Sequence, residues 1–159
     1  MRLTEILSLD AILVPLKTED KYEAIKKLVA SVGDAGRIDD EAQVLKAVLD
    51  REAVMSTGVG DGVAIPHAKS DAAPSLTAGL GITERPVDFE SMDKKPVQII
   101  WLLVGPHGAT GPHIKALSRI SRLMHVDDFR QRLLAAQTSR EVFEIISKEE
   151  QAVAELRHS

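Results

Sequence analysis

Three histidines directly follow a proline, and two of them lie at the boundaries of predicted secondary structure. Pro66-His67 ends the apolar stretch of residues 63–65, and α/β proteins carry their chemistry where strands end at the rim of the sheet. Pro112-His113 precedes an apolar helical pattern, so we expect Pro112 at the first helical position and His113 in the first turn, beside free backbone N–H groups. A neutral imidazole is a nucleophile toward phosphorus or an N–H donor to a phosphoryl oxygen. The spacing leaves a plain structural role for His67 open.

Arg51 lies near the end of a predicted helix over residues 40–52. A cation at a helix C-terminus interacts favourably with the helix dipole, by up to about 1 kcal/mol. A guanidinium also presents N–H donors to phosphoryl oxygens and neutralises charge during phosphoryl transfer. The sequence does not choose between these two roles for Arg51.

Other chemistries fit the sequence less well. The glycines of "STGVGDG" (56–62) match neither the dinucleotide-binding fingerprint nor a P-loop, and we interpret this segment as a loop that allows close approach of another surface. His67, His107 and His113 supply three imidazoles for a zinc hydrolase, but the spacings H-x-x-x-H and H-E-x-x-H are absent. A serine hydrolase lacks its G-x-S-x-G elbow. We expect no metal and no cofactor, and a surface-loop position for His107; zinc stays the competing hypothesis.

Composition narrows the class of protein. The 159 residues carry a formal net charge of −4 without a basic block, which disfavours a nucleic-acid partner. The absence of cysteine excludes disulfides and thiolate catalysis and fits a reducing compartment. The longest apolar run, residues 99–104, is too short to span a bilayer, and the N-terminus shows no export signal. We expect a cytoplasmic protein without membrane insertion.

Hydrophobic periodicity predicts helices before and after a block of strands. Apolar runs predict strands at residues 12–16, 62–66, 76–83 and 97–104, the last covered on both faces. Helices are expected after an N-cap at Thr18, over 40–52, after Pro112, from Asp127, and from a capping box at Thr138. This order predicts one α/β domain over residues 1–150, with a mixed sheet between helical layers. Residues 151–159 are expected to form a polar tail or a frayed helix extension.

Three segments together resemble a known family. "STGVGDGVAIPHAK", "PVQIIWLLVGP" and "GPHIKALSRISRLM" closely resemble the type-2 IIA component of the bacterial phosphoenolpyruvate-dependent phosphotransferase system, the fructose/mannitol and nitrogen-regulatory class. The match covers roughly residues 3–148 and includes the motifs A-I-P-H-A, H-[LI]-K-A-L and R-E-x-x-x-S-T-G. It implies the family's mixed sheet between helical layers, in agreement with the fold expected above.

The resemblance also assigns roles to residues. It implies that His67 accepts a phosphoryl group, on Nε2, from the phosphocarrier protein HPr or a nitrogen-type paralogue. His113 is then the second histidine of the pocket and Arg51 the arginine that faces the phosphate. Thr57 would offer its hydroxyl to the phosphate, and the small Ala68 would let the partner's histidine come close. Neither a metal nor a nucleotide is required.

The branch of the family stays open between two roles. The 159 residues contain no IIB, IIC or HPr-like segment, and "VDFESMDKKP" is closer to the nitrogen-regulatory branch. We therefore expect a regulatory phosphocarrier that acts on target proteins. The alternative is a fructose/mannitol-type IIA that passes phosphate to a IIB, and a different class is a binding module without transfer. One departure is Pro106-His107, where many members of the family have a proline followed by an acid; this change bears on which partner docks.

Overall fold

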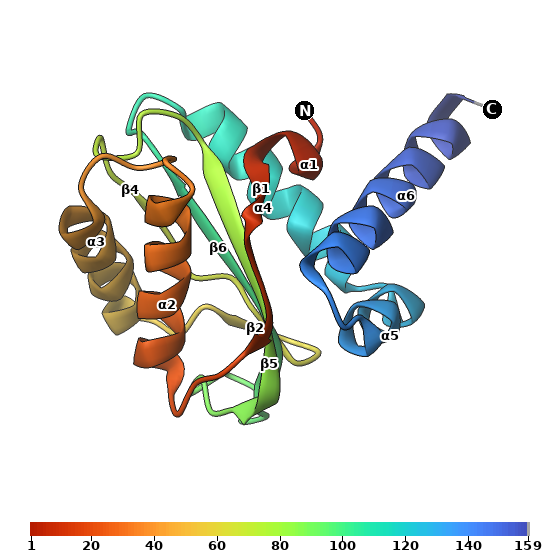
Figure 1. Ribbon diagram of the computed structural model, residues 1–159, viewed down its shortest axis with the longest axis horizontal. Coiled ribbons are helices and arrows are strands. Elements are labelled where there is room, and N and C mark those ends of the chain that lie inside the picture. The colour runs from red at the N-terminus through yellow and green to blue at the C-terminus, as the bar shows by residue number, and fades with distance from the viewer. Residues whose placement is uncertain (159) are drawn as a thin grey trace.

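The computed structural model describes the backbone of residues 1–158 and the side chains of residues 1–156. A six-stranded sheet in the order β1-β5-β6-β3-β2, with β4 also paired to β6, forms the middle layer. Helices α2 and α3 cover one face, and α1, α4, α5 and α6 lie on the other (Figure 1). Two separate apolar cores fill the space between the sheet and these two helical layers. The predicted α/β architecture, a mixed sheet between helical layers, is confirmed.

Three long strands make the centre of the sheet. β6 (Val97–Gly105) pairs antiparallel with β5 (Thr77–Val87), which pairs parallel with β1 (Leu7–Leu16). β6 is buried at every position except Gln98, as its unbroken apolar run predicts. β1 begins five residues earlier than predicted, because the exposed Asp10 interrupts the apolar pattern within the strand.

The segment before the first histidine differs from the sequence prediction. Residues 56–62 are not only a loop, because β2 (Gly58–Gly60) pairs antiparallel with β3 (Val63–Ala64). The turn between them needs positive φ angles, 93° at Gly60 and 74° at Gly62, which glycine adopts without strain. The chain does not end its strand at Pro66: β4 (His67–Lys69) resumes beside β6. The proline interrupts the ladder because it has no N–H to donate, while its carbonyl accepts from the Leu103 N–H at 3.0 Å.

The helices after residue 20 are close to those predicted, with corrections at the starts of two of them, whereas α1 was not predicted from the sequence. Their bounds are α1 (Leu3–Ile6), α2 (Lys21–Asp34), α3 (Glu41–Val54), α4 (Thr110–Met124), α5 (Asp127–Ala135) and α6 (Ser139–His158). The N-cap of α2 is Asp20, whose carboxylate accepts from the Glu23 N–H at 2.8 Å; Thr18 instead donates its hydroxyl to the Asp20 carbonyl. Pro112 is the third residue of α4, two positions later than predicted.

The C-terminal helix is longer than the sequence indicates. α6 has 20 residues and continues through residues 151–158, the segment expected to be a tail or a helix extension; Ser159 and the His158 side chain lie outside the described part of the chain. Within residues 1–158, no helix combines the length and the apolar character needed to cross a bilayer.

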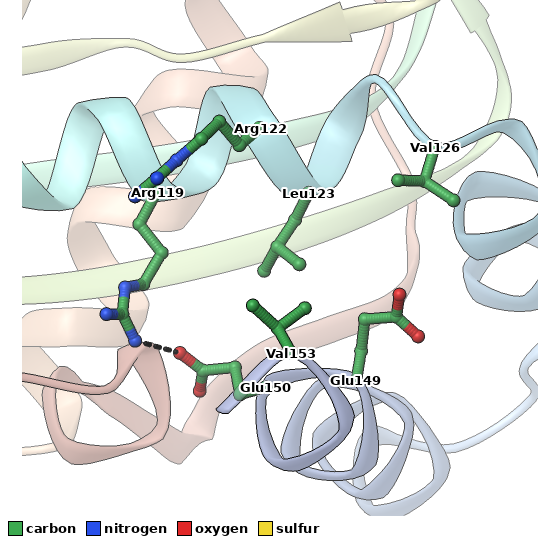
Figure 2. A pocket seen from close by; sticks show the side chains of 7 residues that line it. All are labelled: Arg119, Arg122, Leu123, Val126, Glu149, Glu150 and Val153. Atoms are coloured by element: carbon green, nitrogen blue, oxygen red, sulfur yellow. Dashed lines mark hydrogen bonds and ion pairs between the residues drawn. The ribbon is translucent and has the colours of Figure 1, made fainter. Parts of the chain in front are cut away.

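Glu150 joins α6 to two other helices. Its buried carboxylate accepts from the Leu3 N–H at 2.7 Å and the Thr4 N–H at 3.2 Å, so it caps α1. It also accepts from Arg119 of α4 at 3.2 Å, across a groove of about 270 Å³ whose apolar floor includes Leu123 and Val153 (Figure 2). The groove contains no histidine among the residues that line it.

Candidate functional site

A pocket of about 460 Å³ lies between α3, β4 and the start of α4. Arg51, His67, Ala68 and His113 all line it, although Arg51 and His113 stand far apart in the sequence. The structure therefore brings together four of the five residues that the sequence proposes for the site.

His67 is held with one ring nitrogen engaged and the other free. Its Nδ1 lies 2.7 Å from the Ile65 carbonyl oxygen. A carbonyl only accepts hydrogen bonds, so Nδ1 carries the hydrogen, and in the neutral ring Nε2 carries the lone pair. Burial lowers the pKa of His67 and the bond to Ile65 opposes this. The positive charge of Arg51 lowers the pKa and the negative charge of Glu52 raises it, so that the pKa is lowered overall. The ring is consequently neutral at physiological pH, with a nucleophilic Nε2.

His113 is the more deeply buried of the two histidines. It is 3% exposed, and its ring centroid lies 5.9 Å from that of His67 in an edge-on arrangement. Burial, His67 and Lys69 together lower its pKa to about 4, so the ring is neutral. Its Nδ1 has no hydrogen-bond partner among the described residues. The backbone N–H of His113 is not free, because it donates to the Ala109 carbonyl at 3.0 Å.

Arg51 lies both at the end of α3 and at the pocket. It lies in the last turn of α3, and its Nη1 donates to the carbonyl of Met55, the C-cap residue, at 2.9 Å. The same side chain lines the pocket and acts electrostatically on His67. A guanidinium has five N–H donors, so this single bond to the helix end leaves others for an anion.

Thr57 does not join the other site residues. It is 4% exposed, is not among the residues that line the pocket, and its hydroxyl donates to Glu52 Oε2 at 2.6 Å. The expectation that this hydroxyl reaches the phosphate is therefore not supported by the structure. Ala68 does line the pocket as expected, and a larger side chain there would fill part of it.

Several residues around the two histidines were not among the site residues predicted from the sequence. Lys69 lines the pocket, with its Nζ 3.0 Å from the Thr110 hydroxyl. An apolar rim is made by Ala47, Ile114 and Leu117. Ile114 fits the helical apolar pattern that normally marks a core position, yet it is 61% exposed. Its position one residue after His113 is the signal that could have placed it at the site.

His107 lies in the exposed loop between β6 and α4, as expected, and also lines the pocket. Its backbone N–H and ring Nδ1 lie 3.1 and 3.2 Å from the Asp71 carboxylate. The hydrogen bond from the His107 backbone N–H, followed by the one from the His107 ring, holds the pKa of Asp71 below its ordinary value. A carboxylate therefore stands beside the proline–histidine pair at 106–107. Across the described chain, no three His, Asp or Glu side chains gather in a group that could hold a metal ion.

The fold and the site together define a class of protein: an α/β domain that presents a neutral histidine, with a free Nε2, next to an arginine in an open pocket. The family model described as "Phosphoenolpyruvate-dependent sugar phosphotransferase system, EIIA 2" matches residues 5–149. The chain belongs to this family, and the resemblance seen in the sequence is confirmed.

Relatives from both branches of the family are similar to the chain. A nitrogen regulatory protein of Bradyrhizobium diazoefficiens is 35% identical over 147 residues, which is 92% of this chain and 95% of that protein. A fructose-specific EIIABC component of Bacillus subtilis is 32% identical over 93% of this chain, and the chain spans only 23% of its length.

Solved structures share the fold. The nitrogen regulatory protein IIA-Ntr of Neisseria meningitidis superposes with a TM-score of 0.84 and 30% identity, over 90% of this chain and 97% of that one. The mannitol IIA of Escherichia coli, solved in complex with phosphorylated IIB, has a TM-score of 0.75 and 19% identity, over 89% of this chain and 99% of that one; this second likeness concerns the fold alone.

Proposed function

We propose that this chain is a cytoplasmic histidine phosphocarrier, a phosphotransferase component that accepts a phosphoryl group on Nε2 of His67. The donor is the phosphohistidine of HPr or of a nitrogen-type paralogue. One observation carries the proposal: the bond from Nδ1 of His67 to the Ile65 carbonyl at 2.7 Å. It leaves Nε2 as the nucleophile without requiring a base to remove a proton.

The transfer balances without a separate proton step. The Nε2 lone pair of His67 forms the new N–P bond, while the bond between phosphorus and the donor's ring nitrogen breaks. A donor ring that is protonated on its other nitrogen leaves as a neutral imidazole, and the His67 ring, which keeps its Nδ1–H, becomes the cation. The Ile65 carbonyl then accepts from a positively charged ring, and such a hydrogen bond is stronger than a neutral one.

Arg51 and His113 supply the electrostatic part of the reaction. Phosphoryl transfer needs positioning and charge stabilisation more than covalent help, and the guanidinium neutralises charge on the transferred oxygens. His113, neutral because burial lowers its pKa to about 4, donates a ring N–H to a phosphoryl oxygen. The apolar rim around Ile114 and Leu117 gives the carrier a surface to dock on.

We further propose that the role is regulatory, with the phosphorylation state deciding which target proteins the chain binds. The nitrogen regulatory relative supports this, because the two chains match over nearly their whole lengths. The alternative is a fructose/mannitol-type IIA that hands the phosphoryl group to a IIB, and the similarity to a fructose-specific component supports that alternative.

Reconstituted phosphorylation tests the carrier function. The chain is incubated with phosphoenolpyruvate, enzyme I and HPr, and its intact mass is measured before and after mild acid. We expect an acid-labile gain of one phosphoryl group in the wild type, none in His67→Ala, and a slower gain in His113→Ala. A wild-type chain that gains no mass from competent carriers would support the phosphorylation-independent binding module instead.

A second incubation separates the two branches. The phosphorylated chain is mixed with a fructose- or mannitol-type IIB, and the mass of the IIB is followed. Retention of the phosphoryl group on the chain is expected for a regulatory protein. Rapid transfer to the IIB would assign the chain to sugar uptake.

A further inference from the structure

Glu52 follows Arg51 directly but faces the interior instead of the pocket. Its side chain is 1% exposed. Both carboxylate oxygens lie 3.2 Å from the Thr57 backbone nitrogen, Oε2 accepts from the Thr57 hydroxyl at 2.6 Å, and Oε1 lies 3.4 Å from Lys21 Nζ. Burying a carboxylate costs free energy unless hydrogen-bond donors surround it. Here the donors come from Thr57, which follows α3, and from Lys21 of α2.

Lys21 brings the matching charge from another helix. It is the first residue of α2, and its side chain is only 5% exposed. Its Nζ also lies 3.7 Å from Glu90 and 5.9 Å from the centre of the Phe89 ring. The Lys21–Glu52 pair thus connects α2, the end of α3 and the segment after β5. Buried ion pairs add little net stability compared with apolar residues of the same size, so stability alone does not account for this one.

The hydrogen bonds between Glu52 and Thr57 enclose Met55, the residue whose carbonyl accepts from Arg51. Glu52 and Thr57 stand on either side of Met55, and the Met55 carbonyl accepts from the Arg51 guanidinium at 2.9 Å. The position of that carbonyl depends on how the chain leaves α3. Glu52 accepts from both the N–H and the hydroxyl of Thr57, and these bonds connect the residues that follow Met55 to the last turn of α3.

We propose that Glu52, with Lys21 and Thr57, is a positioning residue that holds the Arg51 guanidinium at the pocket for phosphoryl transfer. This inference rests on the proposed function, because it concerns the rate at which His67 is phosphorylated. It also gives Thr57 a role through Glu52 in place of a direct contact with the phosphate.

A double-mutant cycle between Glu52 and Arg51 tests the inference. The rate of phosphorylation by phosphorylated HPr is measured over a range of carrier concentrations for the wild type, Glu52→Gln, Arg51→Gln and the double variant. Glutamine keeps the size of Glu52 but removes the charge and one acceptor. We expect Glu52→Gln to lower kcat about tenfold with little change in KM, because small misplacements of a catalytic group cost rate rather than binding.

The effect of Glu52→Gln in the Arg51→Gln background separates positioning from general damage to the fold. If Glu52 acts through Arg51, then Glu52→Gln slows the Arg51→Gln background by no more than about twofold. Asp50→Asn is the matched control on the other side of Arg51: Asp50 is exposed and bonds only Lys46, at 2.8 Å. We expect this control to keep the wild-type rate.

Thr57 provides variants that disturb the fold less. Thr57→Val removes only the hydroxyl bond and is expected to slow transfer in the wild type but not in the Arg51→Gln background, while Thr57→Ser, which keeps a hydroxyl, should retain the wild-type rate. These variants decide the question if Glu52→Gln does not fold.

Two sets of results would overturn the inference. An equal fall with and without Arg51, for Glu52→Gln or for Thr57→Val, would mean that these residues act independently of the arginine. A wild-type rate in both Glu52→Gln and Thr57→Val would mean that they do not act at all. Both outcomes leave the wild type phosphorylated and the proposed function intact; a wild type that takes no phosphoryl group overturns the function and the inference together.

Discussion

Replacement of His113 by glutamine is expected to reduce the sensitivity of the protein to mild acid. The ring is 3% exposed, and burial, followed by the charges of His67 and Lys69, lowers its pKa from 6.5 to about 4. In the unfolded chain the ring takes up a proton near its ordinary pKa. Between these two values the unfolded state binds a proton that the folded state does not, so the free energy of unfolding falls as the pH falls.

The size of this effect follows from the two pKa values. The full shift corresponds to roughly 3 kcal/mol, reached only below the folded pKa. At pH 5 most of the unfolded rings and few of the folded ones are protonated, which makes the loss relative to pH 7 about 2 kcal/mol. His113→Gln removes this contribution, so the variant should lose that much less stability than the wild type over the same range.

Urea unfolding at pH 7 and pH 5 measures the difference. Trp101 is the only tryptophan and is fully buried, so its fluorescence reports unfolding of both proteins. The carboxylates titrate equally in the two chains, and their contribution cancels when the pH dependences are subtracted. An NMR titration of the His113 ring in the wild type checks the pKa directly.

Equal pH dependence in the two proteins would refute the reasoning. It would mean that the His113 ring titrates alike in the folded and unfolded states, and that solvent or a partner group reaches its Nδ1. A ring pKa near 6.5 by NMR would point the same way.

Three further predictions concern other contacts. Gly58→Ala places a Cβ 2.0 Å from Ser91 Oγ and should lower the free energy of unfolding by about 1–3 kcal/mol; the double variant with Ser91→Gly should recover most of this in a thermal melt. Glu150→Ala removes the cap of α1 and the partner of Arg119, and urea unfolding should show a loss of about 2–3 kcal/mol, against less than about 0.5 for the exposed Lys46→Ala. Lys69→Met removes a positive charge that lowers the pKa of His113, so NMR should show that pKa rise; an unchanged value would place the Lys69 ammonium too far away to act.

The parts of the fold that could be predicted are those that depend on short sequence patterns, such as apolar runs and helical spacing. β6 was predictable because an unbroken apolar run fits a strand covered on both faces. The helices after residue 20 were predictable from their spacing. The capping box predicted at Thr138 is confirmed, because its hydroxyl accepts from the Glu141 N–H at 3.1 Å. The cap of α2 was not predictable, because Thr18 and Asp20 are both good N-cap residues and only the backbone path selects Asp20. The motifs placed His67, Arg51 and His113, and the structure brings these three residues to one pocket.

The parts that could not be predicted depend on contacts between distant segments. The bond from Lys69 to Thr110 joins residues 41 positions apart, and the cap that Glu150 gives to Leu3 spans 147. The orientation of Thr57 is a different case, because its partner Glu52 is only five residues away. There the motif shows both residues, but whether the hydroxyl points to a phosphate or back to the helix end depends on how the chain leaves α3.

The hydrogen bond that orients His67 has a consequence for how the site tolerates mutation. Its acceptor is the carbonyl of Ile65, a main-chain atom that every amino acid possesses, so no substitution at residue 65 deletes it. Arg51 is held by a main-chain carbonyl too, but one whose place depends on the side chains of Glu52 and Thr57. Single substitutions at Glu52 or Thr57 can therefore displace the Arg51 guanidinium. The tautomer of His67, by contrast, is lost only when the backbone conformation of residues 65–67 changes.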